Sequence, residues 1–141
     1  MGRAYWLFKQ EPSSYSYSRL EAEARTVWDG VSNNLALKYL RSAKRGDRAF
    51  FYHTGDEKSI IGIMEIASSP YSDPKDGSNN NNNRLTVVDV IPIAKLPRPV
   101  SLEAIKADPT FSDWELVRIS RLSVMPVPEP IWKKILKMAG M

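Results

Sequence analysis

The chain has 141 residues and a formal net charge of +4, and its 43% hydrophobic and 26% charged residues are typical of a folded globular protein. It has no cysteine and a single histidine, His53, which excludes a disulfide framework, a thiolate nucleophile and a multi-histidine zinc site. No stretch approaches the roughly 20 apolar residues that cross a bilayer, and an extended segment begins where a signal peptide would otherwise stand. We therefore expect one domain over residues 1–141, without metal, cofactor or membrane partner, and its positive charge favours nucleic acid. The same features favour a cytoplasmic location, with nucleoid or nuclear association as the alternatives.

The first predicted element is a strand over residues 4–9, in which large side chains alternate between two faces. Pro12 ends it, because proline has no backbone N–H for a ladder and restricts the preceding residue to extended geometry. The strand therefore brings Lys9, Gln10 and Glu11 to its carboxyl end. There they form either a solvated strand end or part of a site.

A short helix is expected next, over residues 19–24, because Ser18 and Glu21 have the spacing of a capping box. Trp28 then precedes an Asp-Gly pair that is typical of a turn, so we expect its ring to lie in a loop. The alternative is that Trp28 belongs to the hydrophobic core.

Asn33 or Asn34 can cap a second helix, which Gly46 ends. This helix carries a basic cluster composed of Lys38, Arg41, Lys44 and Arg45. Such a cluster is either a solvated helix face or a set of phosphate contacts.

A hairpin of two strands, residues 49–54 and 60–66, forms the centre of the predicted fold. Both strands are apolar on both faces, so the hairpin must lie beneath other elements or bend into a barrel. Its first strand ends with Tyr52, His53 and Thr54, which bring an aromatic ring and hydrogen-bonding groups to the rim of that barrel.

The second half of the chain begins with a polar insertion at residues 68–84. A strand follows over residues 85–93, and the prolines after it limit its continuation to a sheet margin or a bulge. The later predicted elements are a helix at residues 102–106, a strand at residues 118–127 and a terminal helix from about Pro130 that buries Ile131, Ile135 and Met138.

Arg118 and Arg121 stand at the start of the last predicted strand. They can reach the rim at residues 52–54, or they can form structural ion pairs with Glu65 or Asp89. The strands and helices do not alternate regularly, and no Gly-rich phosphate loop is present, which excludes a doubly wound nucleotide-binding fold. The elements instead predict an α+β fold with a curved or closed mixed sheet of five to six strands and short flanking helices.

Six blocks of sequence, taken in order along the chain, form a recognisable set. They are YWLFKQEP at residues 5–12, WDGVSN at 28–33, residues 46–54, GIME at 62–65, VDV at 88–90 and RLSVMPV at 121–127. Together they resemble the EVE domain family of the PUA-like superfamily. The resemblance implies a pseudo-barrel related to PUA, YTH and ASCH domains, which bind nucleic acid with one base, often a modified base, held in a pocket. EVE domains look like readers of modified cytosine or related bases.

The chain departs from the family pattern at two positions of the implied site. Gln10 stands in the block where the family commonly has Lys-Ser-Glu-Pro, and Ser32 replaces the arginine of Gly-Val-Arg-Asn. The second change removes a cation near the implied pocket, which predicts shifted or weaker specificity. The asparagine run at residues 79–83 also differs from the longer family loop.

A base that leaves its stack needs an aromatic or apolar face, worth roughly 1–3 kcal/mol per base, and hydrogen-bonding groups aimed at its edge. Trp28 is the candidate for that face, and His53 either lines the site or is a hydrogen-bonded rim residue. With the resemblance, the candidate base-binding and nucleic-acid-binding residues are Lys9, Gln10, Glu11, Trp28, Ser32, Asn33, Asn34, Tyr52, His53, Thr54, Arg118 and Arg121. We therefore expect a monomeric, non-catalytic module that binds DNA or RNA carrying a modified base.

Two other classes of function stay open on the sequence alone. A hydrolase or lyase would use His53 with Glu11 or Glu65 as general acid and base, although no nucleophile motif accompanies them. An adaptor for a small molecule or a protein would use the same pocket. Salt-dependent binding of oligonucleotides favours the reader, and turnover lost on changing His53 favours the enzyme.

Overall fold

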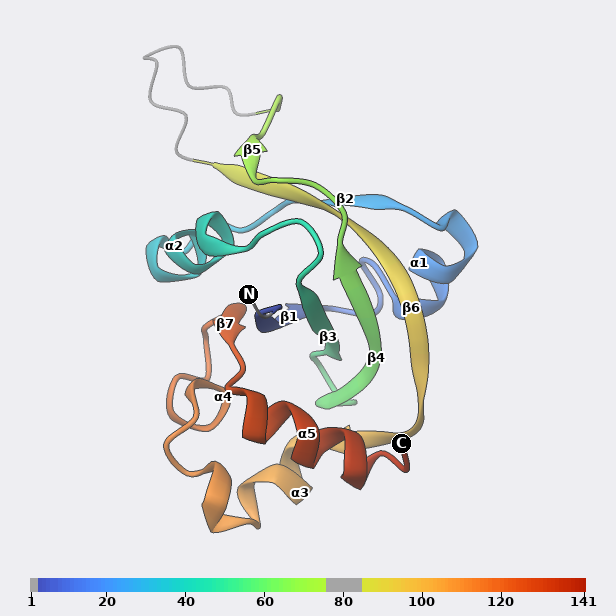
Figure 1. The fold of residues 1–141 in the computed structure, drawn as a ribbon, viewed down its shortest axis with the longest axis vertical. Coiled ribbons are helices and arrows are strands. Elements are labelled where there is room, and N and C mark those ends of the chain that lie inside the picture. Colours follow the sequence, from blue (N-terminus) through green and yellow to red (C-terminus); the bar gives the residue numbers. More distant parts are fainter. Residues whose placement is uncertain (1–2, 76–84) are drawn as a thin grey trace.

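The computed structural model describes residues 3–75 and 85–141, so the asparagine run at 79–83 lies outside the described residues. A mixed, strongly curled sheet forms a half-barrel, and short helices close its open sides (Figure 1). The strands are β1 (Tyr5–Gln10), β2 (Thr26–Trp28), β3 (Arg48–His53), β4 (Ser59–Ile66), β5 (Tyr71–Ser72), β6 (Thr86–Ser101) and β7 (Val124–Pro126). The helices are α1 (Tyr17–Glu23), α2 (Asn34–Ser42), α3 (Leu102–Lys106), α4 (Glu115–Arg118) and α5 (Glu129–Met138), with a 3-10 turn at Pro109–Phe111.

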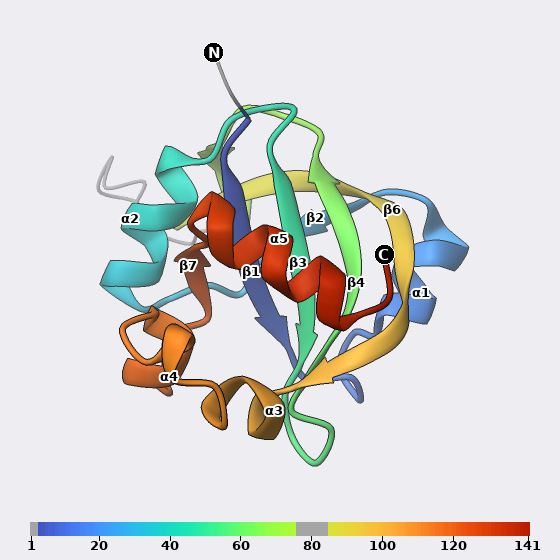
Figure 2. The ribbon, with the colours of Figure 1, turned by 60° about the horizontal axis from the view of Figure 1, so that its bottom comes forward.

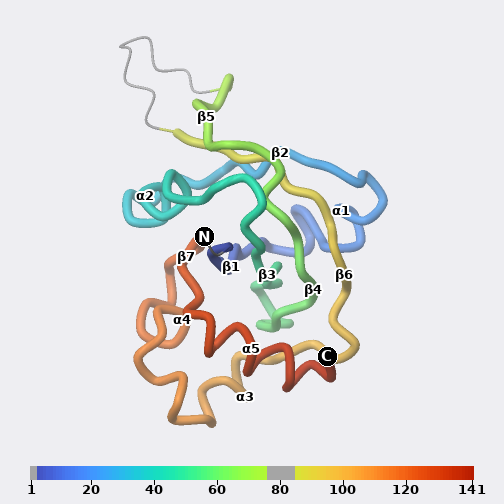
Figure 3. Tube along the Cα trace, in the orientation of Figure 1, coloured from blue at the N-terminus to red at the C-terminus, as the bar shows by residue number. Residues whose placement is uncertain are grey.

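The strand order is β2-β6-β4-β3-β1-β7, with β5 paired to β6 (Figure 3). β1 runs parallel to β3, and the other pairs are antiparallel. The predicted central hairpin is β3–β4, and it lies in the middle of this order. The predicted α+β curved sheet is therefore confirmed, with seven strands among the described residues rather than five to six.

The long strand β6 wraps around the half-barrel and contains the prolines that the sequence assigned to a bulge (Figure 2). Against β4 its register shifts twice, and Pro92 pairs with Met64 directly beside one of the shifts. Pro97 lies in the irregular stretch between the pairings of Lys95 and Val100. The bulges are confirmed, and they allow the strand to continue eight residues beyond its predicted end at Ile93 because no ladder N–H is needed at these prolines.

Helix α5 crosses the outer face of β1, β3 and β4 (Figure 2). Trp132 stacks on Phe50 at 3.9 Å and on Tyr5 at 4.4 Å between ring centroids. Ile135 is buried as predicted, whereas Ile131 is only half-buried. Met138 is likewise half-buried. The buried face of α5 therefore differs from the predicted one by about one residue along the helix. The large indole ring of Trp132 determines which side of the helix meets the sheet.

The inner face of the sheet packs on α1, which begins earlier than predicted. Ser16, not Ser18, caps the helix, because its Oγ accepts a hydrogen bond from Arg19 N at 3.1 Å. Tyr17 is therefore inside the core, where its hydroxyl donates to the Ile63 carbonyl at 2.7 Å. Burial raises the pKa of Tyr17 to about 12.

Two predictions about the ends of strands were wrong. Trp28 does not lie in a loop but ends β2, which pairs with β6. The last strand covers only Val124–Pro126, because Arg118 ends α4 and the residues after it form a turn. In the described part of the chain, no helix combines the length and apolar character needed to cross a membrane.

Candidate functional site

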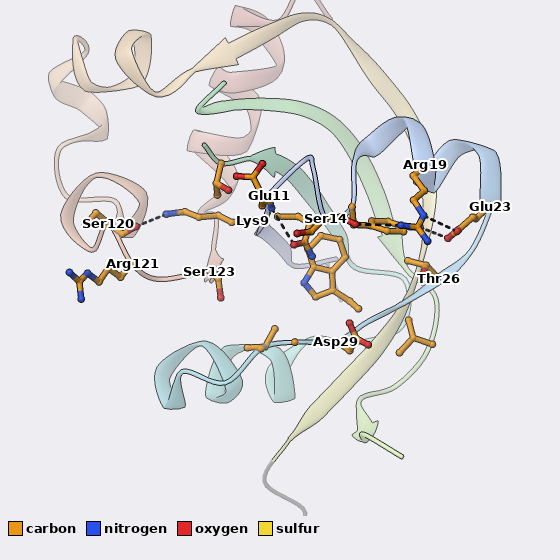
Figure 4. Close-up of a pocket in the computed structure, with 17 residues that line it drawn as sticks. Lys9, Glu11, Ser14, Arg19, Glu23, Thr26, Asp29, Ser120, Arg121 and Ser123 are labelled. Carbon is orange, nitrogen blue, oxygen red and sulfur yellow. Dashed lines mark hydrogen bonds and ion pairs between the residues drawn. The ribbon is translucent and has the colours of Figure 1, made fainter. Parts of the chain in front are cut away.

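A pocket of about 720 Å³ opens at the carboxyl ends of β1 and β3 (Figure 4). Its walls come from the end of β1, the start of α1, β2 with the loop after it, the residue after β3, and the turn before β7. The lining residues are Lys9, Gln10, Glu11, Ser14, Tyr15, Arg19, Glu23, Thr26, Val27, Trp28, Asp29, Gly30, Val31, Thr54, Ser120, Arg121 and Ser123. Six of the residues predicted from the sequence are among them: Lys9, Gln10, Glu11, Trp28, Thr54 and Arg121.

The parallel pairing of β1 with β3 explains why these residues meet. Parallel strands end at the same edge of a sheet, and Gln10 stands in register with His53. Thr54 N donates to the Gln10 carbonyl at 2.9 Å, which fixes Thr54 beside the end of β1. Lys9 N donates to the Ser123 carbonyl at 2.9 Å, which brings the turn before β7 to the same place.

Trp28 forms the apolar wall of the pocket and belongs to the core as well. Its side of the pocket is rigid, because the ring packs on Phe8 at 5.3 Å and on Phe51 at 5.2 Å between centroids. Only 3% of Trp28 is exposed. Trp28 therefore belongs to the core, which is one of the two interpretations offered by the sequence, and it also lines the pocket. The stacking of a base on its ring stays a prediction.

Lys9 is a half-buried cation that lines the pocket, and its side chain extends toward Ser120 (Figure 4). Its Nζ donates to the Ser120 carbonyl at 3.0 Å and lies 5.5 Å from the centroid of the Tyr52 ring. Burial lowers the pKa of Lys9. These partners are neutral, so the ammonium group is poised to attract an anionic ligand.

Glu11 and Asp29 supply carboxylate acceptors to the pocket. Glu11 Oε1 accepts hydrogen bonds from Ser13 N at 3.2 Å and from Ser13 Oγ at 3.1 Å. Asp29 is exposed, and its Oδ2 lies 3.8 Å from Lys75 Nζ. Asp29 was missed from the sequence because the Asp-Gly pair was interpreted only as a turn, although the same turn, with Gly30 at a φ of +78°, presents the carboxylate beside Trp28.

A second polar wall of the pocket was also not predicted from the sequence. Tyr15 donates to Glu23 Oε1 at 2.6 Å, and Arg19 Nε donates to Glu23 Oε2 at 3.2 Å. The hydrogen bond from Tyr15 is the main cause that lowers the pKa of Glu23. The i,i+4 spacing of Arg19 and Glu23 was the available signal, but such a pair is common on solvated helices.

Six predicted residues do not line this pocket, and four of them lie near the helices. Asn33 caps α2, because its Oδ1 accepts from Ala36 N at 3.0 Å, and Ser32 and Asn34 flank it in the chain. Arg118 is exposed at the end of α4, where its Nη1 approaches the Asp113 carbonyl at 3.5 Å. Tyr52 lines a neighbouring pocket instead.

His53, the sixth, is a buried structural residue. Its Nε2 accepts a hydrogen bond from Tyr17 N at 3.1 Å, which leaves the ring proton on Nδ1 to be donated to Glu57 Oε1 at 3.0 Å. Its two ring nitrogens therefore contact Tyr17 and Glu57, and not Glu11 or Glu65, the two carboxylates that the sequence suggested as its partners.

The ion pairs suggested for Arg118 and Arg121 were wrong. Glu65 pairs with Arg48 at 3.0 Å, and Asp89 pairs with Arg25 at 2.7 Å. Arg121 is thereby left in the wall of the pocket, at the side where Lys9 and Ser120 lie (Figure 4).

The curled mixed sheet with a pocket at the ends of its parallel pair defines a PUA-like domain. The YTH domain of Zygosaccharomyces rouxii MRB1, solved with N6-methyladenosine RNA, shares this fold with a TM-score of 0.55 and 20% identity, over 97% of this chain and 86% of that one. The EVE domain family matches residues 4–138, and the chain belongs to that family.

Two relatives define the likeness further. Thymocyte nuclear protein 1 of Rattus norvegicus is 30% identical over 164 residues, which covers 95% of this chain and 73% of the rat protein. The structure of human THYN1 protein in complex with 5-methylcytosine containing DNA has a TM-score of 0.89 and 27% identity, and it covers 98% of both chains.

Proposed function

We propose that this chain is a non-catalytic module that binds nucleic acid and holds one modified cytosine in the pocket beside Trp28. The observation that carries the proposal is the composition of that pocket: a buried ring, carboxylate acceptors and cations line a single cavity of about 720 Å³. Volumes of about 300–1,000 Å³ are typical of small-ligand sites. The complex of human THYN1 protein with 5-methylcytosine containing DNA supports the same class of ligand.

Each feature of 5-methylcytosine finds a chemical counterpart in the pocket. Asp29 and Glu11 can accept a hydrogen bond from the exocyclic amino group, as acidic side chains do when they read cytosine. Trp28 and Val31, both buried, offer apolar surface for the methyl group. Lys9 and Arg121 provide positive charge for the sugar-phosphate backbone, which positions the strand without specifying its sequence.

The positive charges also favour nucleic acid over a neutral small molecule or a protein adaptor. For a neutral ligand, a half-buried ammonium group without a counter-charge would only add a cost of desolvation. For a phosphodiester it supplies a charge-assisted contact.

Three oligonucleotides that differ at one base test the proposal. Thymine carries the methyl group without the amino group, and cytosine carries the amino group without the methyl group. At fixed salt we expect the wild-type protein to prefer 5-methylcytosine over both. Asp29→Ala should lose the discrimination against thymine, worth about 1–3 kcal/mol, and Val31→Ala should lose the discrimination against cytosine, worth about 0.8 kcal/mol for one methyl group.

Asp113→Ala is the matched control, because Asp113 is exposed and lies outside the pocket. Unfolding curves of all variants ensure that only folded protein is compared. Trp28→Ala is unsuitable as a first test, because truncating a buried tryptophan costs about 3–5 kcal/mol of stability whatever the ring binds. Equal affinity of the wild-type protein for the three oligonucleotides would refute the proposal, as would equal losses from Asp29→Ala and Asp113→Ala.

A further inference from the structure

A second pocket adjoins the first on the far side of Lys9. It has a volume of about 250 Å³ and is lined by Lys9, Tyr52, Thr54, Gly55, Lys58, Leu102, Lys106, Leu116 and Ser120. Three of these residues, Lys9, Thr54 and Ser120, line the first pocket as well. A ligand can therefore extend from one pocket to the other past the Lys9 ammonium group.

All charged residues that line the second pocket are positive. Lys9, Lys58 and Lys106 contribute three positive charges, and none of its lining residues is acidic. Among the described residues, no carboxylate oxygen lies within 4.0 Å of any of these three ammonium groups. Unlike the lysines in the ion pairs of α5, these three lysines thus line one cavity without a carboxylate partner in the described part of the chain.

The position of Lys58 carries a conformational cost. Its φ of +43° lies in the left-handed region, which glycine adopts without penalty and a lysine does not. The backbone is held there because the Lys58 carbonyl accepts a hydrogen bond from Leu102 N at 2.8 Å. This bond ties the β3–β4 turn to the start of α3 and places Lys58 and Lys106 on the same cavity.

The Tyr52 ring is not available for stacking a second base. Lys9 Nζ lies 5.5 Å from the centroid of the Tyr52 ring and so occupies the face on which a base would stack. The second pocket therefore offers charge rather than an aromatic platform, which suits a phosphate group and not another base.

Beyond Lys58 and Lys106 the surface changes sign. A third hollow shares these two lysines but is otherwise lined by Asp56, Glu57 and Glu103 together with Ser101 and Leu102. A polyanion that continued over these carboxylates would be repelled. The positive track is consequently short and ends at the second pocket.

We propose that the second pocket binds the backbone phosphodiester directly flanking the held base, so that Lys9, Lys58 and Lys106 set the register of the strand. The proposal rests on the proposed function of the first pocket. It predicts that the strand leaves the pocket on this side and then turns away from the acidic hollow toward solvent. Base choice and strand positioning are thus assigned to adjacent cavities that meet at Lys9.

The test compares a Lys58→Gln/Lys106→Gln double variant with the wild-type protein on a single-stranded oligonucleotide carrying one 5-methylcytosine. The measured quantity is the slope of log affinity against log salt concentration, which changes by about 0.7 for each phosphate contact on a single strand. We expect the double variant to have a slope less steep by about 0.7, because the pocket is proposed to hold one phosphodiester. Its preference for 5-methylcytosine over cytosine should stay the same, because phosphate contacts carry no base information.

The matched control is Lys133→Gln/Lys137→Gln, which removes two exposed lysines of α5 that line neither pocket. A change in slope no larger than that of the control would overturn the proposal while leaving base reading intact. A wild-type protein that binds with a salt-dependent slope but without base preference would instead refute the proposed function of the first pocket, and the slope of the double variant would still decide on the second. A wild-type protein that binds no oligonucleotide would refute both.

Competition with inorganic phosphate distinguishes a pocket for a backbone phosphodiester from a pocket for a free anion. At constant ionic strength, replacing chloride by phosphate should not displace the oligonucleotide if the site is built for a phosphodiester held next to a bound base. Displacement beyond the chloride reference that disappears in the double variant would assign the pocket to free phosphate and overturn the proposal.

Discussion

One end of the parallel β1–β3 pair buries a carboxylate, and the other end half-buries an ammonium group. At the amino end, Asp47 accepts hydrogen bonds from Ala4 N at 3.0 Å, Trp6 Nε1 at 3.0 Å and Lys44 N at 2.9 Å, and only 4% of it is exposed. At the carboxyl end, Lys9 has one carbonyl and the face of one ring. Three hydrogen-bond donors of the protein surround the first charge, whereas cavities adjoin the second on two sides.

This difference separates a charge that stabilises the fold from a charge that is available to a ligand. A buried ion is tolerated when hydrogen-bond donors of the protein replace its water, as they do around Asp47. An ion with few such partners raises the free energy of the unbound protein. A counter-ion that binds beside it lowers the free energy of the complex. The same two strands thus end in buried hydrogen bonds to Asp47 on one side and in the candidate site on the other.

The largest effect is expected from Asp47→Ala at the closed end. The change leaves three backbone or indole N–H donors without their acceptor, and each buried unsatisfied donor costs about 1–3 kcal/mol. Only the bond from Trp6 Nε1 is fully buried and water can reach the two backbone donors, so we expect a loss of about 1–3 kcal/mol in the free energy of unfolding, measured with urea. A loss below ~1 kcal/mol would show that the Asp47 carboxylate does not stabilise this end of the β1–β3 pair.

A smaller change in stability, and a larger one in binding, is expected from Lys9→Met at the open end. Methionine keeps much of the length of the side chain and removes the charge, so stability at neutral pH should change by less than ~1 kcal/mol, while oligonucleotide affinity falls. Lys9 has a lowered pKa in the fold, so the folded protein holds its proton less tightly than the unfolded chain. The wild-type protein should therefore gain stability relative to Lys9→Met as the pH rises from the folded pKa toward 10.5, measured by urea unfolding of both proteins. A relative loss over this range would contradict the assignment of Lys9 as a charge that the fold disfavours.

The smallest effect is expected from Arg48→Gln, which removes the ion pair with Glu65 near the closed end. Both side chains are about a quarter exposed, so water screens the pair and its loss should cost about 0.5–1 kcal/mol. The salt slope of oligonucleotide binding should not change, because this arginine lies outside both pockets. A shallower slope would mean that nucleic acid reaches the amino end of the pair as well.

Sequence patterns predicted the elements that have a strong local signal. The apolar hairpin, the helix at residues 102–106 and the convergence of residues 9–11 with Thr54 all follow from local patterns and strand ends. The strand at Thr26–Trp28 has only three residues and forms because β6 offers it a partner, a long-range pairing that leaves no periodic trace.

The prediction of the site was limited in the same way, because long-range contacts leave no local pattern in the sequence. Trp28, Lys9 and Thr54 were chosen from chemistry and family likeness, and they line the pocket. His53 was chosen because it is chemically versatile, yet its ring nitrogens are used by Tyr17 and Glu57. Asp29 was passed over because a turn explained it, and only the fold shows that the turn forms one lip of a cavity.

The placement of β1 between β3 and β7 has a consequence for the order of assembly. A strand near the start of the chain pairs with residues 124–126 near its end, so this part of the sheet cannot form on the ribosome until those residues have left the exit tunnel. Such distant pairings also slow folding in free solution. Because the turn at Ser120–Ser123 closes the pocket, an incomplete chain would have Trp28 and Lys9 but no cavity between them. The proposed binding would therefore require a chain that has been made at least as far as residue 123.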